Sequence, residues 1–362
     1  MIIRRYLVRE IALPFLVVTA ILLVIFASHR IALLLADALS SGLSGRVVAI
    51  LLGLKLIASL DILLPISLYL GTLIAFGRLY SDREMTVLAA CGLSERQILG
   101  AVLGLAVGFA ILVAVLSMFV KPWAAHMADS VRHQAESSAG VAGISPGRFH
   151  ELIGGRGVVY VAGLGAQERE MRDIFVHMRS KGIDQVYVAR KGYHYLDEQT
   201  GRHAIVLENG HRYDSDASGS VYRVVRYDKL TTWLQRASQD SFVHQRIAAP
   251  TLKLLRSTNR WDIAEFQWRL SMPLATVILV LLAVPLSRMN PRQGKYARVF
   301  TAILVYAVYY NLLGVAKSWV ERGKLPVDPG LGVVHGLMLL VAIVLLLQPW
   351  LSLRWSRSGS TA

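Results

Sequence analysis

The sequence predicts an α-helical membrane protein with six transmembrane helices, arranged three and three around an inserted all-β domain. The 362 residues are 54% apolar and only 17% charged, whereas soluble domains carry roughly 25% charged residues. The charges are concentrated in residues 121–262, which hold 35 of the 63 Lys, Arg, Asp and Glu side chains. The rest of the chain contains six uncharged runs, which are residues 11–27, 62–77, 97–120, 270–287, 299–316 and 329–353.

Each run approaches the length needed to cross a bilayer, which is about 20 mainly apolar residues at 1.5 Å of rise per residue. The second run is the shortest, with 16 residues and Pro65 inside it. The preceding residues 47–60 are apolar apart from Lys55, so we expect a longer, bent or tilted second span. The first run could instead be a cleaved signal, but its apolar character continues through residues 31–36, beyond the length of such a signal.

The distribution of positive charge predicts the orientation of these helices. The formal net charge is +15, which is typical either of nucleic-acid binding or of a membrane protein with basic inside loops. With a cytoplasmic N-terminus, the short inside segments contain twelve basic and four acidic residues, which favours the membrane explanation. The predicted domains are helices 1–3 in residues 1–120, an outer, periplasmic domain in residues 121–262 and helices 4–6 in residues 263–362.

The outer domain is predicted to be all-β. It contains five short runs of β-branched and aromatic residues, separated by turn signals such as Asn209-Gly210. Several strands in series without a helix between them predict an antiparallel sandwich or an open barrel. Such a domain could also be a surface domain without specific chemistry. The five runs are residues 157–162, 173–177, 185–189, 204–207 and 221–227.

The sequence contains no motif that predicts catalysis. The pattern Gly-x4-Gly-Lys-Ser/Thr is absent, so we expect ATP and Mg²⁺ to be bound by a separate ATPase chain and no cofactor in this one. The ten histidines lack the spacing of zinc ligands, and no Gly-x-Ser-x-Gly elbow occurs. The single cysteine, Cys91, cannot form an internal disulfide. Asp61 is the one acidic candidate for a proton relay, and a single carboxylate supports that mechanism poorly.

The inside loop between the second and third spans is predicted to form a short helix, residues 82–91. Residues 81–84 and 94–97 match capping boxes, and Gly92 is placed to end the helix between them. This helix could lie on the lipid surface, or it could dock its apolar side into a groove on a partner protein. The side chains expected to meet such a partner are Glu84, Met85, Val87 and Leu88.

Basic residues at the outer boundary depart from the positive-inside pattern. Arg30 follows the first apolar run, and Lys317 ends the fifth run, with two more basic residues close behind. These side chains could extend to lipid headgroups, or they could bind an anionic, phosphorylated amphiphile. The four candidate binding residues are Arg30, Lys317, Arg322 and Lys324.

Three segments resemble a known family. They are the opening Met1-Ile-Ile-Arg-Arg-Tyr-Leu-Val-Arg-Glu10, the loop Glu84-Met-Thr-Val-Leu-Ala-Ala-Cys-Gly-Leu-Ser94 and the segment Asn290-Pro-Arg-Gln-Gly-Lys295. These segments are similar to those of the LptF/LptG family, the permease subunits of the lipopolysaccharide exporter, and they favour the LptF branch over the LptG branch. The resemblance covers essentially the whole chain. It implies three spans, a periplasmic β-jellyroll and three further spans in the inner membrane.

The resemblance also implies partners and residue roles. The chain would pair with an LptG subunit over a dimer of the ATPase LptB, with LptC as an accessory subunit and LptA beyond it. Glu84 would engage the ATPase, while Arg30 and Lys317 would contact lipopolysaccharide phosphates. The arginine at position 30 replaces a lysine found elsewhere in the family, which keeps the charge but changes its geometry. Spans one and five would flank an opening through which the lipid leaves the outer leaflet.

Two other functions are compatible with the same topology. Another ABC permease, exporting lipoprotein or peptide, would also lack a phosphate-binding loop. A membrane sensor with a periplasmic β-domain would share the spans but would gain nothing from a docking helix. Co-purification of an ATPase would therefore distinguish a permease from a sensor.

Overall fold

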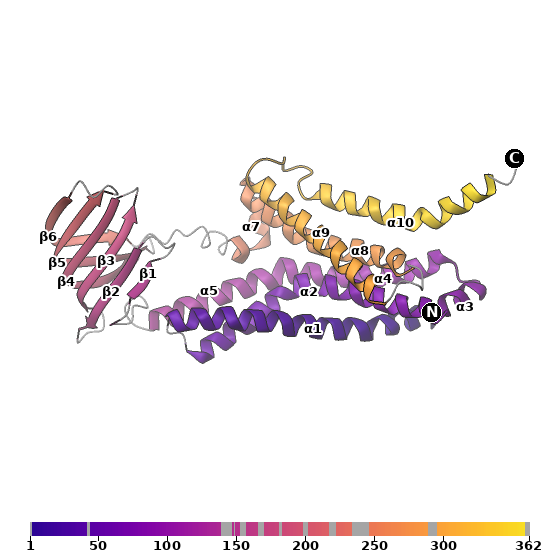
Figure 1. Ribbon diagram of the computed structural model, residues 1–362, viewed down its shortest axis with the longest axis horizontal. Helices are drawn as coiled ribbons and strands as arrows, with labels where there is room; N and C mark the ends of the chain where they lie inside the picture. Colours follow the sequence, from indigo (N-terminus) through magenta and orange to yellow (C-terminus); the bar gives the residue numbers. More distant parts are fainter. Residues whose placement is uncertain are drawn as a thin grey trace. The chain divides into compact units, whose positions relative to one another are not determined.

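Figure 1 shows the computed structural model of the chain. It describes residues 2–41, 44–138, 147, 149–152, 157–165, 170–180, 183–197, 202–216, 222–233, 246–288 and 295–358. Two compact units are present. The helical unit comprises Met1–His29, Leu54–His126 and Arg246–Ala362, and the second unit comprises Arg30–Gly53 and Met127–Gln245. Residues 290–294, which contribute to the family resemblance, lie outside the described residues.

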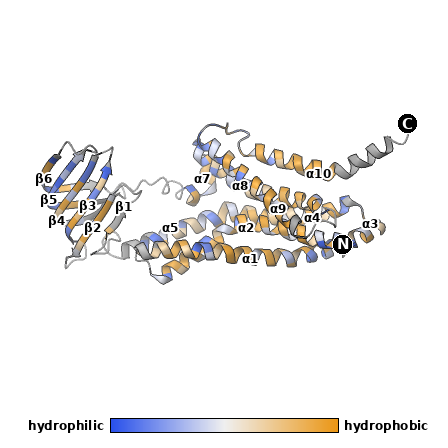
Figure 2. Ribbon diagram, in the orientation of Figure 1, coloured by the Kyte–Doolittle hydropathy of each residue, from blue (hydrophilic) through white to orange (hydrophobic). Residues whose placement is uncertain are grey.

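The apolar runs of the sequence form helices, because a lipid-exposed backbone can satisfy its own polar groups only within a helix or a closed barrel. Figure 2 shows that apolar residues dominate these helices. In chain order they are α1 (Ile2–Ser41), α2 (Gly45–Ser81), α3 (Glu84–Ala90), α4 (Glu95–Val115), the π-helix η1 (Leu116–Val120), α5 (Lys121–Ser138), α7 (Thr251–Leu255), α8 (Arg260–Ser287), α9 (Lys295–Glu321) and α10 (Gly332–Ser358).

Five helical segments of the described chain are long and apolar enough to cross a membrane. The second of them runs without interruption from Gly45 to Ser81, with Pro65 inside it, so the expectation of a longer second span is confirmed. The apolar part of α10 that is described, Gly332–Leu347, is shorter than the other five. The structure therefore confirms five spans by length and composition, while the sixth stays a prediction.

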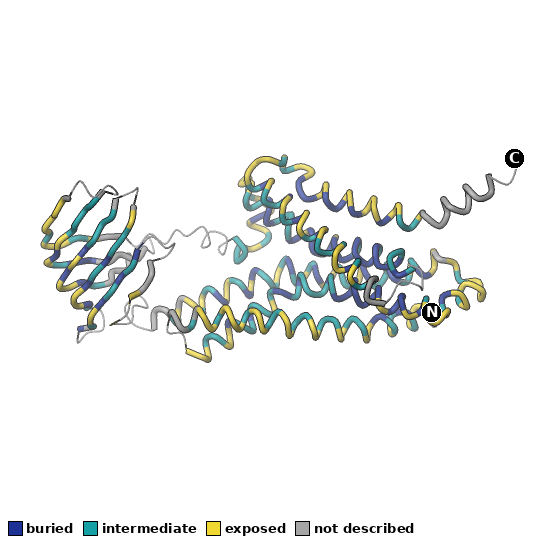
Figure 3. Tube along the Cα trace, in the orientation of Figure 1, coloured by how far each residue is buried: buried dark blue, intermediate teal, exposed yellow. Residues whose placement is uncertain are grey.

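Helix α8 lies at the centre of the helical unit. In its most apolar window 67% of the residues are buried, against 6% to 28% in the other four spans. One face of α8 packs in a cluster with α2, α9 and α10, and another packs in a cluster with α1, α2, α3 and α4. Many large apolar residues of α1, α9 and α10 are exposed, and Figure 3 shows exposed positions along these three helices.

The third span is longer than its apolar run. Helices α4, η1 and α5 follow one another without a gap from Glu95 to Ser138, because the uncharged run is followed by residues that still favour a helix. The first strand of the sheet begins at Phe149. The sheet therefore occupies a narrower part of the chain than the predicted outer domain, residues 121–262.

The second unit contains a six-stranded antiparallel sheet. Its strand order, β1-β2-β3-β4-β5-β6, follows the chain, so each strand pairs with its neighbour in sequence. The predicted antiparallel strands are confirmed. The predicted outer domain is not all-β, because α5 and α7 also lie within residues 121–262. A second sheet, as a sandwich or jellyroll requires, is not found among the described strands. The strands are β1 (Phe149–Leu152), β2 (Gly157–Leu164), β3 (Glu170–Ser180), β4 (Ile183–Asp197), β5 (Arg202–Asp216) and β6 (Tyr222–Trp233).

One side of the sheet carries its apolar core, because alternate side chains of a strand point to the same face. Val159 and Val161 on β2 are buried with Ile174 and Val176 on β3. Tyr187 and further residues of β4 and β5 complete the cluster. This alternation is the reason that the short β-branched runs of the sequence predicted the strands.

Asn209-Gly210 does not form a turn between two strands. Both residues lie inside β5, where Asn209 adopts a positive φ of 53°, a conformation that Asn tolerates in strands as well as in turns. The pairing of β5 with β4 and with β6 keeps its register on both sides of this point. A Cβ at Gly210 would overlap the carbonyl oxygen of Val188 and the hydroxyl of Tyr227. Glycine is required here because neighbouring groups occupy the space of a side chain.

We expect Gly210→Ala to destabilise the sheet by about 1–3 kcal/mol, the usual cost of overpacking. Hydrogen exchange of β5 amides in the full-length chain measures this loss as faster exchange. Gly163→Ala on β2 is a matched control, because a Cβ there meets nothing within 4 Å. Equal protection in both variants would contradict the overlap at Gly210.

Candidate functional site

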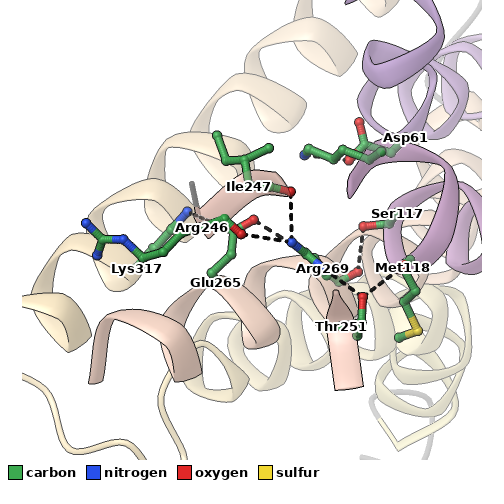
Figure 4. A network of polar contacts seen from close by, with 10 residues as sticks. Asp61, Ser117, Met118, Arg246, Ile247, Thr251, Glu265, Arg269 and Lys317 are labelled. Carbon is green, nitrogen blue, oxygen red and sulfur yellow. Dashed lines mark hydrogen bonds and ion pairs between the residues drawn. The ribbon is translucent and has the colours of Figure 1, made fainter. Parts of the chain in front are cut away.

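A charged side chain is fully buried in the helical unit. Arg269 on α8 is 0% exposed. Its guanidinium donates hydrogen bonds to Thr251 Oγ1 at 2.7 Å and to the carbonyl oxygens of Arg246 at 3.1 Å and Ile247 at 3.0 Å. Figure 4 shows these bonds converging on Arg269. Neutral acceptors thus replace the water that the buried guanidinium has lost.

Glu265, one helical turn before Arg269, is shared by two cations. Its side chain is nearly fully buried, with Oε1 3.6 Å from Arg269 Nε. Its other oxygen, Oε2, accepts a hydrogen bond from Lys317 Nζ on α9 at 2.5 Å. Lys317 Nζ also lies 5.1 Å from the centre of the Trp268 ring, within the range of a cation–π contact. One carboxylate therefore neutralises one fixed arginine and holds one lysine.

The same network reaches the middle of the third span. Ser117 Oγ donates to the carbonyl oxygen of Arg269 at 3.0 Å, and Thr251 Oγ1 donates to the carbonyl oxygen of Met118 at 2.5 Å. Ser117, the donor of the first bond, and Met118, the acceptor of the second, both lie in η1, the π-helical turn before Pro122. Proline has no N–H for the carbonyl four residues earlier, which is that of Met118. The freed carbonyl of Met118 is therefore available to Thr251.

A second buried ion pair lies close by. Asp61 on α2 is 1% exposed, and its Oδ2 accepts a hydrogen bond from Lys121 Nζ on α5 at 2.7 Å. Asp61 was considered from sequence only as a lone carboxylate near a boundary. The structure instead gives it a cationic partner 60 residues away in the chain, which joins the second and third spans.

The predicted phosphate-binding residues fall into two groups. Lys317, Arg322 and Lys324 lie near the end of α9 in the helical unit. Arg322 and Lys324 are exposed, whereas the Lys317 side chain is 23% exposed and paired with Glu265. Arg30 is half-buried on α1 and belongs to the second compact unit.

Two central residues of this network, Glu265 and Arg269, were not predicted from the sequence. Glu265 and Arg269 precede the predicted fourth span, which was taken to begin at residue 270, whereas α8 begins at Arg260. Their spacing of four residues places them on one face of a helix. That spacing next to an apolar run is the signal that could have identified them.

The short helix of the inside loop is present, with one of its two predicted caps. Ser94 caps α4 in a complete capping box with Gln97, and Gly92 adopts a φ of 85° after α3, as expected. The predicted box at residues 81–84 is wrong. Ser81 belongs to α2 and donates to the carbonyl oxygen of Gly77, while Arg83 is the N-cap of α3 without a side-chain cap. The Ser81 hydroxyl is therefore used within its own helix and does not cap α3.

The four residues expected to face a partner are divided between two sides of α3. Met85 is buried in the cluster formed with α1, α2, α4 and α8, and Leu88 packs against it. Val87 is exposed. Glu84 accepts a hydrogen bond from the hydroxyl of Tyr6 on α1. Met85 therefore anchors α3 to its own chain, a correction to its expected outward position, and Glu84 connects α3 to the first helix.

These features define a multi-pass membrane protein with a buried charge network and an inserted β-sheet. The model of the family "Lipopolysaccharide export system permease LptF/LptG" matches residues 5–348. The permease proteins LptF of Escherichia coli K12 and of Shigella flexneri are each 30% identical to this chain, over 97% of it and 95% of their own lengths. The chain belongs to the LptF/LptG family and is a lipopolysaccharide export permease subunit of the inner membrane.

We expect Lys121→Ala to destabilise the helical unit by about 3–5 kcal/mol, because it leaves the buried Asp61 carboxylate without its cation. The midpoint of thermal unfolding of the purified protein measures this loss. The double variant Asp61→Asn, Lys121→Gln removes both charges and should recover most of the stability. A double variant less stable than Lys121→Ala would contradict the pairing.

Proposed function

We propose that this chain extracts lipopolysaccharide from the outer leaflet of the inner membrane and passes it towards a periplasmic β-bridge. The observation that carries this proposal is the position of Lys317, a partly exposed amine at the end of a membrane helix, followed by the exposed Arg322 and Lys324. An ammonium group there can bind a lipid phosphate. Arg30 is proposed as a further phosphate contact, supported by its charge and half-buried position on α1.

Extraction requires an energy source outside this chain. Each methylene of an acyl chain that leaves the bilayer costs about 0.8 kcal/mol, and a lipid with several acyl chains therefore does not leave spontaneously. The sequence has no phosphate-binding loop. We propose that a dimer of the ATPase LptB binds ATP and Mg²⁺, that an LptG subunit is the second permease, and that this chain is itself not an enzyme.

Helix α3 is proposed to receive the motion of the ATPase. Val87 offers an exposed apolar side chain, and Leu88 packs at the edge of the buried cluster that contains Met85. Glu84 carries a negative charge suited to a basic residue of the partner. Because Glu84 also accepts a hydrogen bond from Tyr6, a displacement of α3 would be transmitted directly to α1. Helix α1 is one of the two helices proposed to flank the opening for the lipid.

The sheet is proposed to be the periplasmic exit of the lipid, with a jellyroll-like form in the full chain. Strands β1 and β6 are the edges of the described sheet. An edge strand has unpaired backbone groups that can pair with a strand of another protein. We propose that LptC, and LptA beyond it, continue the sheet from such an edge.

Lys317→Gln is expected to weaken lipopolysaccharide binding several-fold, because the phosphate loses one ammonium contact. Photocrosslinking of lipopolysaccharide to the complete transporter in proteoliposomes measures this. Lys253→Gln removes a basic charge from an exposed position on α7 and is the control. Unchanged crosslinking in Lys317→Gln would refute the proposed role and leave Lys317 as a lysine that only extends to headgroups.

Glu84→Ala is expected to reduce transport-coupled ATP hydrolysis strongly, and Tyr6→Phe to reduce it less, in the same direction. If the Tyr6 hydroxyl acts through Glu84, then Tyr6→Phe has no further effect in the Glu84→Ala background. Tyr69→Phe is the control, since the Tyr69 hydroxyl has no hydrogen-bond partner among the described residues. Additive losses in the double variant would show that Tyr6 acts independently of Glu84.

A further inference from the structure

The carboxylate of Glu265 lies between two cations that differ in mobility. We propose that Glu265 is a positioning residue that competes with the lipid phosphate for Lys317, so that Lys317 alternates between Glu265 and the phosphate during each transport cycle. This inference rests on the proposed function, because it concerns how the phosphate contact is made and released. It adds an acidic residue to a site predicted from basic residues alone.

Only one of the two cations can leave Glu265. Arg269 is fully buried, and three acceptors outside its ion pair fix the guanidinium in place. Among the described residues Lys317 has one hydrogen-bonded partner, Glu265, and its side chain is 23% exposed. A lysine side chain has four methylene groups and can turn its ammonium towards the surface. Lys317 is therefore the mobile partner of the carboxylate.

Arg269 makes the departure of Lys317 possible. A buried carboxylate without a cation is strongly unfavourable, and Glu265 would be in that state if Lys317 were its only partner. With Arg269 Nε 3.6 Å from Oε1, Glu265 keeps a positive neighbour when Lys317 turns away. The pair that remains has no net charge. The burial of Arg269 next to Glu265 therefore permits the exchange.

The return of Lys317 to Glu265 has a function in release. A site that holds a phosphate with a free ammonium binds tightly but also releases slowly. Glu265 offers Lys317 an alternative partner at hydrogen-bond distance, which lowers the net affinity for the phosphate. Trp268 lies on the same side of α8 and contacts the ammonium at 5.1 Å, so the lysine has a favourable surface next to the carboxylate. Glu265 thus lowers the affinity for the phosphate and allows faster release in each cycle.

The test uses the complete transporter, reconstituted with its ATPase, and purified lipopolysaccharide as the probe. Glu265→Gln cannot form an ion pair with Lys317, so it should retain several-fold more lipopolysaccharide before ATP is added and release a smaller fraction afterwards. Dephosphorylated lipopolysaccharide should show no such gain. Glu321→Gln is the matched control, because it removes an acidic charge four residues after Lys317 on α9 without breaking the Glu265 pair.

The double variant Glu265→Gln, Lys317→Gln shows whether the gain acts through Lys317. Retention in the double variant should fall to that of Lys317→Gln alone. A gain in retention that persists there, or an equal gain in Glu321→Gln, would mean that removal of any nearby negative charge raises retention. Either result would overturn the inference. Unchanged retention in Glu265→Gln would overturn it as well.

The failure of this inference can be separated from the failure of the proposed function. If Lys317→Gln alone leaves retention unchanged, the phosphate contact itself is refuted. If Lys317→Gln lowers retention while Glu265→Gln does not raise it, only the competition is refuted. Should Glu265→Gln not assemble, Glu265→Asp keeps the charge beside Arg269 but shortens the reach to Lys317, and intermediate retention is then expected, whereas retention equal to wild type would refute the competition.

Discussion

The burial of one arginine in the central helix constrains the elements around it. Arg269 is fully buried in α8, and a buried charge must have hydrogen-bond acceptors and a counter-ion. The acceptors come from Thr251 and from the backbone that leads into α7, and the counter-ion is Glu265 on the same helix. Elements far apart in sequence are thereby fixed at one point of the helical unit.

An irregular turn in the third span contributes to the same site. The π-helical turn η1 precedes Pro122, which cannot donate to the carbonyl of Met118. Thr251 uses that carbonyl, and Ser117 in the same turn bonds to the carbonyl of Arg269. Pro122 would weaken an isolated helix. Here it leaves free the carbonyl through which the third span contacts Thr251 at the arginine site.

The two ends of the helical unit use charges differently. At the Arg269 site the charges are buried and shared, so a change in one partner alters the others. At α3 the contact with α1 is the hydrogen bond from Tyr6 to Glu84, and nearby Arg78 on α2 pairs with Glu10 on α1 at an exposed position. This difference fits the proposed roles, in which α3 moves with the ATPase and the Arg269 site keeps its geometry while Lys317 changes partner.

The sequence by itself determined the membrane class, most of the span positions, the antiparallel sheet and the capping of α4, because apolar length, period-two alternation and local caps depend on residues close together in the chain. It also marked Lys317 as exceptional. Only the tertiary structure paired Lys317 with Glu265, Asp61 with Lys121 and Tyr6 with Glu84, placed Asn209-Gly210 inside a strand and turned Met85 inward. Those features depend on contacts between residues that are distant in sequence, and one sequence contains no local signal for which distant charges or surfaces will meet.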